Sequence, residues 1–317
     1  MTESSTSPSR VLVVGFILLA VVCLYQAFRL SQFSSKVSED DISLALLQEC
    51  VLNVQATVST NEITEDALTP RLLLDTDDIA DYVEAFPVDD YDIYPMPGGL
   101  ITGNLYLDDV KDVIKDELKE GNLWETHVID MIVKYAQRGT TILDVGAHIG
   151  VHSLIMSKLA GPTGRVYAYE PQKKLYRELV HNMRLNDAIN VVPMRYAAGD
   201  TLAVIEMNPP TQGNEGGTSV GEGGDQAELR TIDSFGVKNV SLIKLDVEHL
   251  EDQVLEGARQ TILESNPVIL VEIQGGYLPD SAPPGILKKK AATIKRIEDM
   301  GYSVLRFGYY DYVGIPN

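Results

Sequence analysis

The sequence has few cysteines and few basic residues. Its two cysteines, Cys23 and Cys50, give no framework for a disulfide-stapled fold. Only 26 lysines and arginines stand against 46 acids, so the formal net charge is −20. A surface this acidic repels a phosphate backbone, so the composition argues against nucleic acid as substrate or partner.

Zinc-type ligand spacing is also missing from the sequence. No set of cysteines and histidines has the spacing of a zinc site. The acids of Asp246-Val247-Glu248 fall on opposite sides of an extended chain, which is a poor geometry for a shared ion. The sequence therefore predicts no obligate metal.

One long apolar run is present near the start of the chain. Val11–Phe28 carries no charged residue and approaches the roughly 20 residues that span a bilayer. Tyr25-Gln26-Ala27 is a poor match to a signal-peptidase site. After a short tail, residues 1–10, we therefore expect a retained signal anchor at 11–28. The large domain that follows suits a single-pass, type II protein with a lumenal domain in the ER or Golgi.

A stalk and an acidic linker are expected between the anchor and the main domain, over residues 29–99. Ser38 resembles a helix cap, and an imperfect apolar stripe continues to about Val58. Weak self-association through this stalk is possible in principle. From Leu72 to Val110 there is no lysine or arginine, which indicates a linker that becomes ordered near Leu105. The main domain is then 100–317.

Strands and helices alternate through this domain. This alternation predicts an α/β fold, a Rossmann-like, doubly wound and mostly parallel sheet with a terminal antiparallel hairpin. The expected helices are 108–120, 126–138, 150–159, 173–186, 250–263 and 286–300, and the expected strands are 142–145, 166–170, 190–197, 240–246, 267–273, 302–307 and 309–313.

The chain is organised around Thr141–Gly150, an apolar strand that breaks into a glycine-spaced turn. A dinucleotide site needs a glycine where His148 stands, and no Gly-Lys-Ser/Thr of a P-loop follows. What remains is Asp-x-Gly-x-x-x-Gly, formed by Asp144, Gly146 and Gly150. Glu170 closes the next strand, where an acid can accept both hydroxyls of a ribose. This pattern fits S-adenosylmethionine better than turn formation alone.

Several motifs resemble a known family. DVGAHIGVHSLIMSKLAGPTGRVYAYEP, LVHNMRLND, LIKLDVEHLEDQVLEGARQTI and PVILVEI occur in this order over about Asn122–Val313. They resemble the FkbM family of S-adenosylmethionine-dependent methyltransferases, which implies a class I methyltransferase fold. The resemblance also implies methylation of hydroxyl oxygens, often on sugars or natural products.

The resemblance assigns residues position by position. It places Asp144, Gly146, Gly150 and Glu170 at the cofactor, with Asp200 in the adenine-side loop, Glu125 in an entry element, and Lys244, Asp246 and Glu248 in a fourth-strand motif. The sequence departs from the family at His249-Leu250, where glycine and a small or aromatic residue are usual. The shape of the acceptor pocket is therefore the least defined part of the comparison.

Three side chains after the strand 240–246 are candidates for the base that takes the hydroxyl proton. They are Glu248, Asp246 and His249, all at the carboxyl end of the sheet, where ligands bind in such folds. Each has an alternative. Glu248 would instead cap the helix from Leu250, Asp246 would hold Lys244 or the methionine end of the cofactor, and His249 would bond locally.

Two other functions fit parts of the sequence. Leu72-Leu73-Leu74-Asp75-Thr76-Asp77 resembles the Asp-x-Asp of membrane-anchored glycosyltransferases. That motif requires a nucleotide-binding unit before it, and only the anchor and stalk precede Asp75 and Asp77. A non-catalytic protein that kept the fold would be favoured by loss of Gly146, Glu170 and Asp246, and all three are present.

Overall fold

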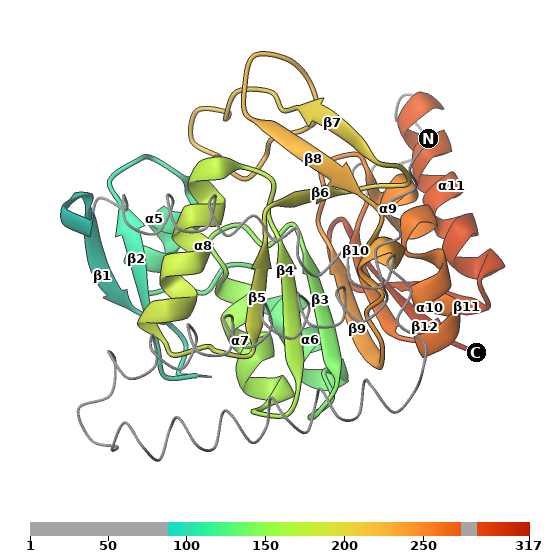
Figure 1. Cartoon of the computed structure of the whole chain (residues 1–317), viewed down its shortest axis with the longest axis horizontal. Helices are drawn as coiled ribbons and strands as arrows, with labels where there is room; N and C mark the ends of the chain where they lie inside the picture. Colours follow the sequence, from blue (N-terminus) through green and yellow to red (C-terminus); the bar gives the residue numbers. More distant parts are fainter. Residues whose placement is uncertain (1–87, 100, 274–283) are drawn as a thin grey trace, which may run out of the picture. The chain divides into compact units, whose positions relative to one another are not determined.

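A seven-stranded sheet forms the centre of the molecule, in the order β11-β12-β10-β9-β3-β4-β5 (Figure 1). The strands from β10 to β5 run parallel, and β12 pairs antiparallel with both β10 and β11. The predicted α/β class and terminal hairpin are thus confirmed. The strands are β3 (Thr141–Val145), β4 (Arg165–Tyr169), β5 (Val191–Met194), β9 (Val240–Leu245), β10 (Val268–Glu272), β11 (Tyr302–Arg306) and β12 (Asp311–Pro316).

The computed structural model describes residues 88–99, 101–273 and 284–317, all within the unit Asp75–Asn317. Among these residues no helix has the length and apolar character needed to cross a bilayer. The predicted anchor, the stalk and the Asp75/Asp77 motif lie outside the described residues, so these expectations stay predictions.

Helices cover both faces of the sheet because its central strands are apolar on both sides. Ile142 of β3 and Leu242 of β9 enter one core, whereas Leu143 and Ile243 enter the other. The first core is closed by α6 (Thr126–Tyr135), α7 (Val151–Ala160) and α8 (Lys173–Leu185). The second is closed by α9 (Glu251–Gly257), α10 (Arg259–Ser265) and α11 (Pro284–Asp299). The sheet is doubly wound, as predicted.

An antiparallel hairpin precedes the first predicted helix. A short 3-10 turn, η1 (Val88–Asp90), leads into β1 (Tyr91–Pro95), which pairs with β2 (Asn104–Asp108). The sequence assigned β1 to the linker and began a helix at Asp108. The helix, α5 (Val113–Lys119), begins later because Asp112 is its N-cap and accepts hydrogen bonds from two backbone amides.

A second, small sheet lies beyond the carboxyl end of β5. It has the order β6-β8-β7, with β6 (Tyr196–Ala198), β7 (Ala203–Glu206) and β8 (Gln226–Arg230), followed by the 3-10 turn η2 (Ile232–Phe235). The predicted strand 190–197 is therefore two strands. The predicted helix 250–263 is likewise two helices, α9 and α10, which meet at Ala258.

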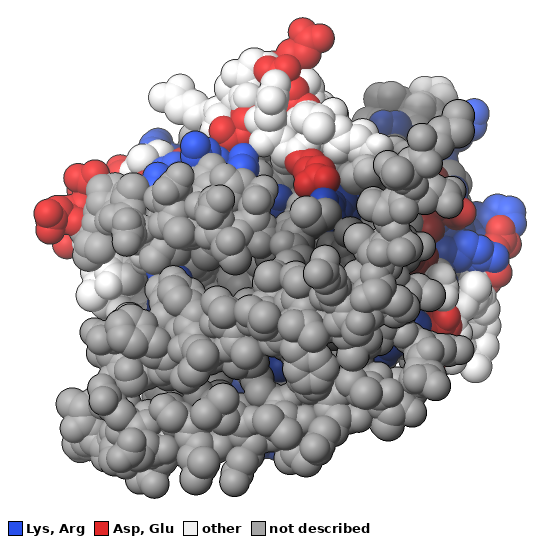
Figure 2. Space-filling model, in the orientation of Figure 1, with Lys and Arg blue, Asp and Glu red and all other residues white. Residues whose placement is uncertain are grey.

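Charged side chains are visible in the part of Figure 2 that is not grey. Lysine and arginine gather over α11, whose sequence PGILKKKAATIKRIED holds five basic residues. Acidic side chains stand out at the opposite edge, where η1 and β1 contribute Asp89, Asp90 and Asp92.

Candidate active site

A cavity of about 240 Å³ opens at the carboxyl ends of β3, β4, β9 and β10. This is the place where ligands bind in open parallel sheets. The turn after β3, the end of β4 and the segment after β9 form its floor. Its lining includes Val113, Ile114, Trp124, Glu125, Gly146, His148, Tyr169, Glu170, Gln172, Ala197, Ala198, Asn214, Gly216, Gly217, Thr218, Asp246, Glu248, Leu250 and Glu272.

The turn after β3 is built on Gly146. Its φ is +84°, and a Cβ there would lie 1.8 Å from the carbonyl oxygen of Asp246. The two chain segments that leave β3 and β9 are thus in backbone contact, which only glycine permits. Gly150, with φ +92°, serves packing instead. A Cβ at Gly150 would meet Leu179 and Met183 of α8 at 2.6 Å, and the residue does not line the cavity.

Asp144 lies beneath the turn, outside the cavity lining. It is fully buried, accepts a 2.5 Å hydrogen bond from Ser153 Oγ of α7, and lies 3.6 Å from Lys244 Nζ. Register explains this contact, since Asp144 and Lys244 are partners on adjacent parallel strands. Burial raises the pKa of Asp144, and the Lys244 charge opposes that rise. Asp144 therefore supports the turn from below and does not line the cavity.

Glu170 follows β4 and lines the cavity, as predicted. Its carboxylate accepts hydrogen bonds from the backbone amides of His148 and Gln172, both at 2.9 Å. Burial raises its pKa to about 7. Each oxygen accepts one amide, and an ionised carboxylate offers about four acceptor positions, so both oxygens keep capacity for hydroxyl donors. A ribose is the ligand that this arrangement suits.

Three carboxyls gather around the end of β9. Asp246 lies 3.1 Å from Lys244 Nζ and shares a hydrogen bond with Glu272. Burial alone would raise the pKa of Asp246, but the Lys244 charge and these hydrogen bonds lower it. Burial and the Asp246 charge raise the pKa of Glu272 to about 10 and that of Glu125 to about 7. At neutral pH Asp246 is thus the ionised member, and Glu272 carries the shared proton.

Glu125 reaches this group because of its backbone. With φ +50° it stands in the left-handed region immediately before α6. The predicted entry element therefore does contribute to the cavity. Glu272 was not among the predicted site residues, although its position as the acid that ends β10 matches that of Glu170 at the end of β4.

The candidate bases after β9 are separated by the turn. Glu248 lines the cavity, and burial followed by the Asp246 charge raises its pKa. His249 is exposed, has φ +76° and does not line the cavity. His249 therefore lies outside the lining of the cavity, and its role as a base stays a prediction. The N-cap of α9 is Leu250, which makes no side-chain cap hydrogen bond. The Glu251 carboxylate accepts the amide of His249, which precedes the cap, at 2.9 Å.

The adenine-side loop enters the cavity through small residues. Ala197 and Ala198 line it, whereas Asp200 is exposed and outside the lining. The cofactor contact expected of Asp200 stays a prediction. The chain turns after Gly199, which packs against Leu229.

The glycine-rich stretch 211–225 lies at the cavity, which Asn214 and residues 216–220 line, although no motif in the stretch indicates that role. Gly216 packs on His148, since a Cβ there would lie 2.8 Å from the ring. Burial lowers the pKa of His148 to about 4, so the ring is neutral. Its Nε2 is buried without a hydrogen-bond partner among the described residues.

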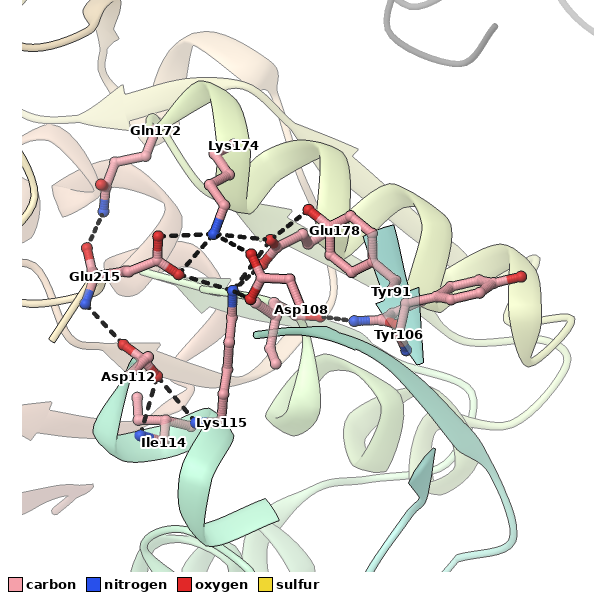
Figure 3. Close-up of polar contacts among 12 residues, drawn as sticks. Tyr91, Tyr106, Asp108, Asp112, Ile114, Lys115, Gln172, Lys174, Glu178 and Glu215 are labelled. Carbon is pink, nitrogen blue, oxygen red and sulfur yellow. Dashed lines mark hydrogen bonds and ion pairs between the residues drawn. The ribbon is translucent and has the colours of Figure 1, made fainter. Parts of the chain in front are cut away.

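One group of acids has the proximity of metal ligands. Asp108, Glu178 and Glu215 are buried and close together. Their common centre is occupied by the Lys115 ammonium, whose distances to these carboxylates are 2.8, 2.9 and 2.7 Å (Figure 3). An ammonium group thus stands where an ion would lie, and the part of the chain described here offers no other such group.

Solved structures resemble the fold at low sequence identity. Methyltransferase FkbM from Methylobacillus flagellatus KT matches at 20% identity and TM-score 0.39, covering 55% of this chain and 42% of that one. A putative rRNA-methylase from Clostridium thermocellum matches at 14% identity and TM-score 0.40, covering 61% and 95%. Aeropyrum pernix fibrillarin with natively bound S-adenosyl-L-methionine matches at 15% identity and TM-score 0.40, covering 74% of this chain and 85% of that one. With TM-scores this low, none of these likenesses bears on function.

The family follows from the sequence. No curated protein matches the chain. The family model described as "Methyltransferase FkbM domain" matches residues 144–304, just over half of the 317 residues. The match begins at Asp144 and contains the turn, Glu170, Asp246 and Glu248. The chain belongs to the FkbM family of S-adenosylmethionine-dependent methyltransferases.

Proposed function

We propose that this methyltransferase acts on a hydroxyl oxygen of a glycan or small molecule, with Glu248 as the proton acceptor. The observation that carries the proposal is the position of the Glu248 carboxylate. It lines the cavity beside Asp246, and burial raises its pKa above that of an ordinary glutamate. A more basic carboxylate is a better acceptor for a hydroxyl proton.

The cavity fits S-adenosylmethionine on its own geometry. Glu170 keeps acceptor capacity for ribose hydroxyls, Gly146 leaves the turn without a side chain, and Ala197 and Ala198 leave a flat, small-residue wall. Asp246, ionised beside Lys244, suits a cationic ligand. When bound, the cofactor supplies a methyl group on a sulfonium. The protein's part is to align the acceptor and remove its proton.

The acceptor class is tested by the atom that receives the methyl group. The full chain would be incubated with methyl-labelled S-adenosylmethionine and a panel of monosaccharides, glycans, amines and thiols. We expect the label on oxygen in a sugar or polyol. Label on nitrogen or sulfur, with none on oxygen, would contradict the proposal.

Glu248→Gln tests the assignment of the base. The amide keeps the shape of the side chain but accepts no proton, so single-turnover rates should fall by about two to four powers of ten while cofactor affinity stays near wild type. Glu251→Gln is the matched control, because Glu251 is a neighbouring buried acid that does not line the cavity. The control should lose some stability but keep its rate. An active Glu248→Gln enzyme would move the role to Asp246.

We further propose that the enzyme is held on a membrane by Val11–Phe28, as a type II protein with its domain in the ER or Golgi lumen. The support is the uncharged apolar run without a cleavage site. Because the chain belongs to a methyltransferase family, we do not propose a glycosyltransferase function for Asp75 and Asp77.

A further inference from the structure

We propose that Glu215 is a positioning residue for cofactor binding, held by an ion cluster that fixes the cover of the cavity. The cluster, called the latch, consists of Lys115, Lys174, Asp108, Glu178 and Glu215. The cover, called the roof loop, is residues 211–225. The inference rests on the proposed use of this cavity for S-adenosylmethionine.

The roof loop has little that would fix it by packing. Its sequence over the cavity is Asn-Glu-Gly-Gly-Thr-Ser, and Asn214, Gly216, Gly217 and Thr218 line the site. Internal bonds give it a shape, for example the 2.9 Å bond from the Gly217 amide to Asn214 Oδ1. Glycine pairs leave the backbone conformationally free. The ends of the loop are held by hydrogen bonds from the Val113 amide to the Gly213 carbonyl at 3.0 Å and from the Lys173 amide to Asp225 Oδ2 at 2.7 Å. The segment between these ends, which lines the cavity, needs an anchor of its own.

Glu215 supplies that anchor. Its side chain turns into the protein, where Oε2 lies 2.7 Å from Lys115 Nζ and Oε1 lies 2.7 Å from Lys174 Nζ (Figure 3). Lys115 is fully buried and also holds Asp108 and Glu178. Lys174 bridges to Asp108 at 2.6 Å. Two ammonium groups and three buried carboxylates form this network, and loss of the Glu215 charge removes two of its ion pairs, each 2.7 Å long.

The backbone of Glu215 is held from both sides. Its amide donates to Asp112 Oδ2 at 2.7 Å, and the other oxygen of Asp112 caps α5. Its carbonyl accepts the Gln172 side-chain amide at 3.0 Å. The backbone amide of Gln172 in turn donates to Glu170. A continuous chain of bonds thus joins the latch to the acid that faces the ribose.

The latch is assembled from two parts of the sequence. Lys115, Asp108 and Asp112 belong to β2 and α5, before the segment 144–304 that the family model matches. Glu178 and Glu215 lie within that segment. The elements before the family-matched segment are therefore part of the cofactor site, because they place its roof.

Glu215→Gln tests the latch by removing one charge at constant size. The probe is S-adenosylmethionine alone, titrated calorimetrically into the full-length chain, with hydrogen exchange of the roof-loop amides measured in parallel. We expect the dissociation constant to rise at least about tenfold and the roof-loop amides to lose protection, while exchange in β3 and β9 stays unchanged. Glu222→Gln is the control, since Glu222 is an exposed acid of the same loop. It should change neither quantity.

Lys174→Gln gives a second variant if Glu215→Gln does not fold. Lys174 is 40% exposed, so its loss leaves the core intact, and we expect the same two changes with smaller size. Unchanged affinity in a folded variant would overturn the latch, and so would uniform loss of protection across the sheet. No binding by the wild-type chain would instead overturn the cofactor cavity, and the latch with it.

Discussion

At the scale of single residues, the site carboxyls differ because their surroundings differ. Asp246 is ionised because Lys244 lies 3.1 Å away, whereas Glu272 is neutral because it is buried against the Asp246 charge. Glu170 has no lysine partner of this kind, and burial holds its pKa at about 7. Acids with opposite pKa shifts thus share one cavity. Asp246, with a lowered pKa, is ionised, whereas Glu272 and Glu170, with raised pKa values, hold a proton more readily.

Glu170→Gln should change how stability depends on pH. The folded-state pKa of about 7 lies above the ordinary 4.5, so the favourable contribution of Glu170 is present below pH 4.5 and is lost as pH rises through about 7. Glutamine does not ionise. The unfolding free energy of the variant relative to wild type should therefore rise by about 3 kcal/mol between acidic and mildly alkaline pH. Urea unfolding of both proteins without cofactor measures this, and parallel pH profiles would contradict it.

Asp246→Asn should damage cofactor binding and rate together. Asparagine leaves the buried Lys244 without its ionised partner at the cavity, although Asp144 remains 3.6 Å away. We expect weaker cofactor affinity by about 1–3 kcal/mol, from the lost charge-assisted bond. Calorimetry and single-turnover rates on this variant, beside Glu248→Gln, separate binding from proton removal. Normal affinity for Asp246→Asn would place the cofactor away from β9.

The sequence located some of these residues because an acid that ends an apolar strand has a fixed position. Glu170 was found in this way, and Glu272 carries the same signal. His249 was placed with Glu248 because both follow β9, but His249 has φ +76° and only Glu248 of the two lines the cavity. The residue types alone do not predict a local backbone turn of this kind. Asp144 followed from the Asp-x-Gly-x-x-x-Gly spacing, whereas its contact with Lys244 beneath the turn follows from strand register.

At the scale of elements, the turn after β3 is the tightest feature. Gly146→Ala would place a methyl group 1.8 Å from the Asp246 carbonyl oxygen at φ +84°. We expect at least about 3 kcal/mol of lost stability, from strain and displaced backbone. Gly121→Ala is the control, because its φ is +87° and nothing lies within 4 Å of the added Cβ. It should cost about 1–2 kcal/mol. Equal losses of stability in the two variants, measured by thermal unfolding, would show that the close approach of Gly146 to the Asp246 carbonyl does not affect stability.

The elements that sequence periodicity predicted are those with buried faces. β3, β4, β9, β10 and the helices between them have strong apolar patterns and were found. β1 was assigned to the linker because the stretch from Leu72 to Val110 around it has many acids and no lysine or arginine. In the structure three of its five residues are exposed. β7 is similar, with Val204 73% exposed. The pairing of such strands depends on partners that are distant in the sequence. The small sheet of β6, β7 and β8 and the hairpin of β1 and β2 were therefore not predicted from local sequence patterns.

At the scale of the whole molecule, the hairpin of β1 and β2 is joined to the rest of the described domain through Tyr91. Tyr91 Oη donates to Glu178 Oε1 at 2.8 Å, which ties β1 to α8 and the latch. A fragment that starts at residue 100 loses this bond and the partner of β2. We expect it to melt several degrees below a fragment that starts at residue 88, because β2 becomes an unpaired edge. Equal melting temperatures would show that β1 contributes nothing to the domain.

The membrane proposal concerns the other end of the chain. The full chain should sediment with membranes and resist carbonate extraction, as a helix of roughly 20 apolar residues does. The fragment that starts at residue 88 should be recovered without membranes. A mature N-terminus just after Ala27 would show that the apolar run is a cleaved signal peptide.

The central claim is that the cavity at the ends of β3, β4 and β9 holds S-adenosylmethionine through Glu170. Calorimetry of the full chain with S-adenosylmethionine and with NAD, on wild type and Glu170→Ala, tests it most directly. Wild type should bind S-adenosylmethionine and give no heat with NAD. Glu170→Ala should bind about 1–3 kcal/mol more weakly through lost hydrogen bonds to the ribose, at a melting temperature that shows it folded. Binding of NAD alone, or unchanged affinity in folded Glu170→Ala, would contradict the claim.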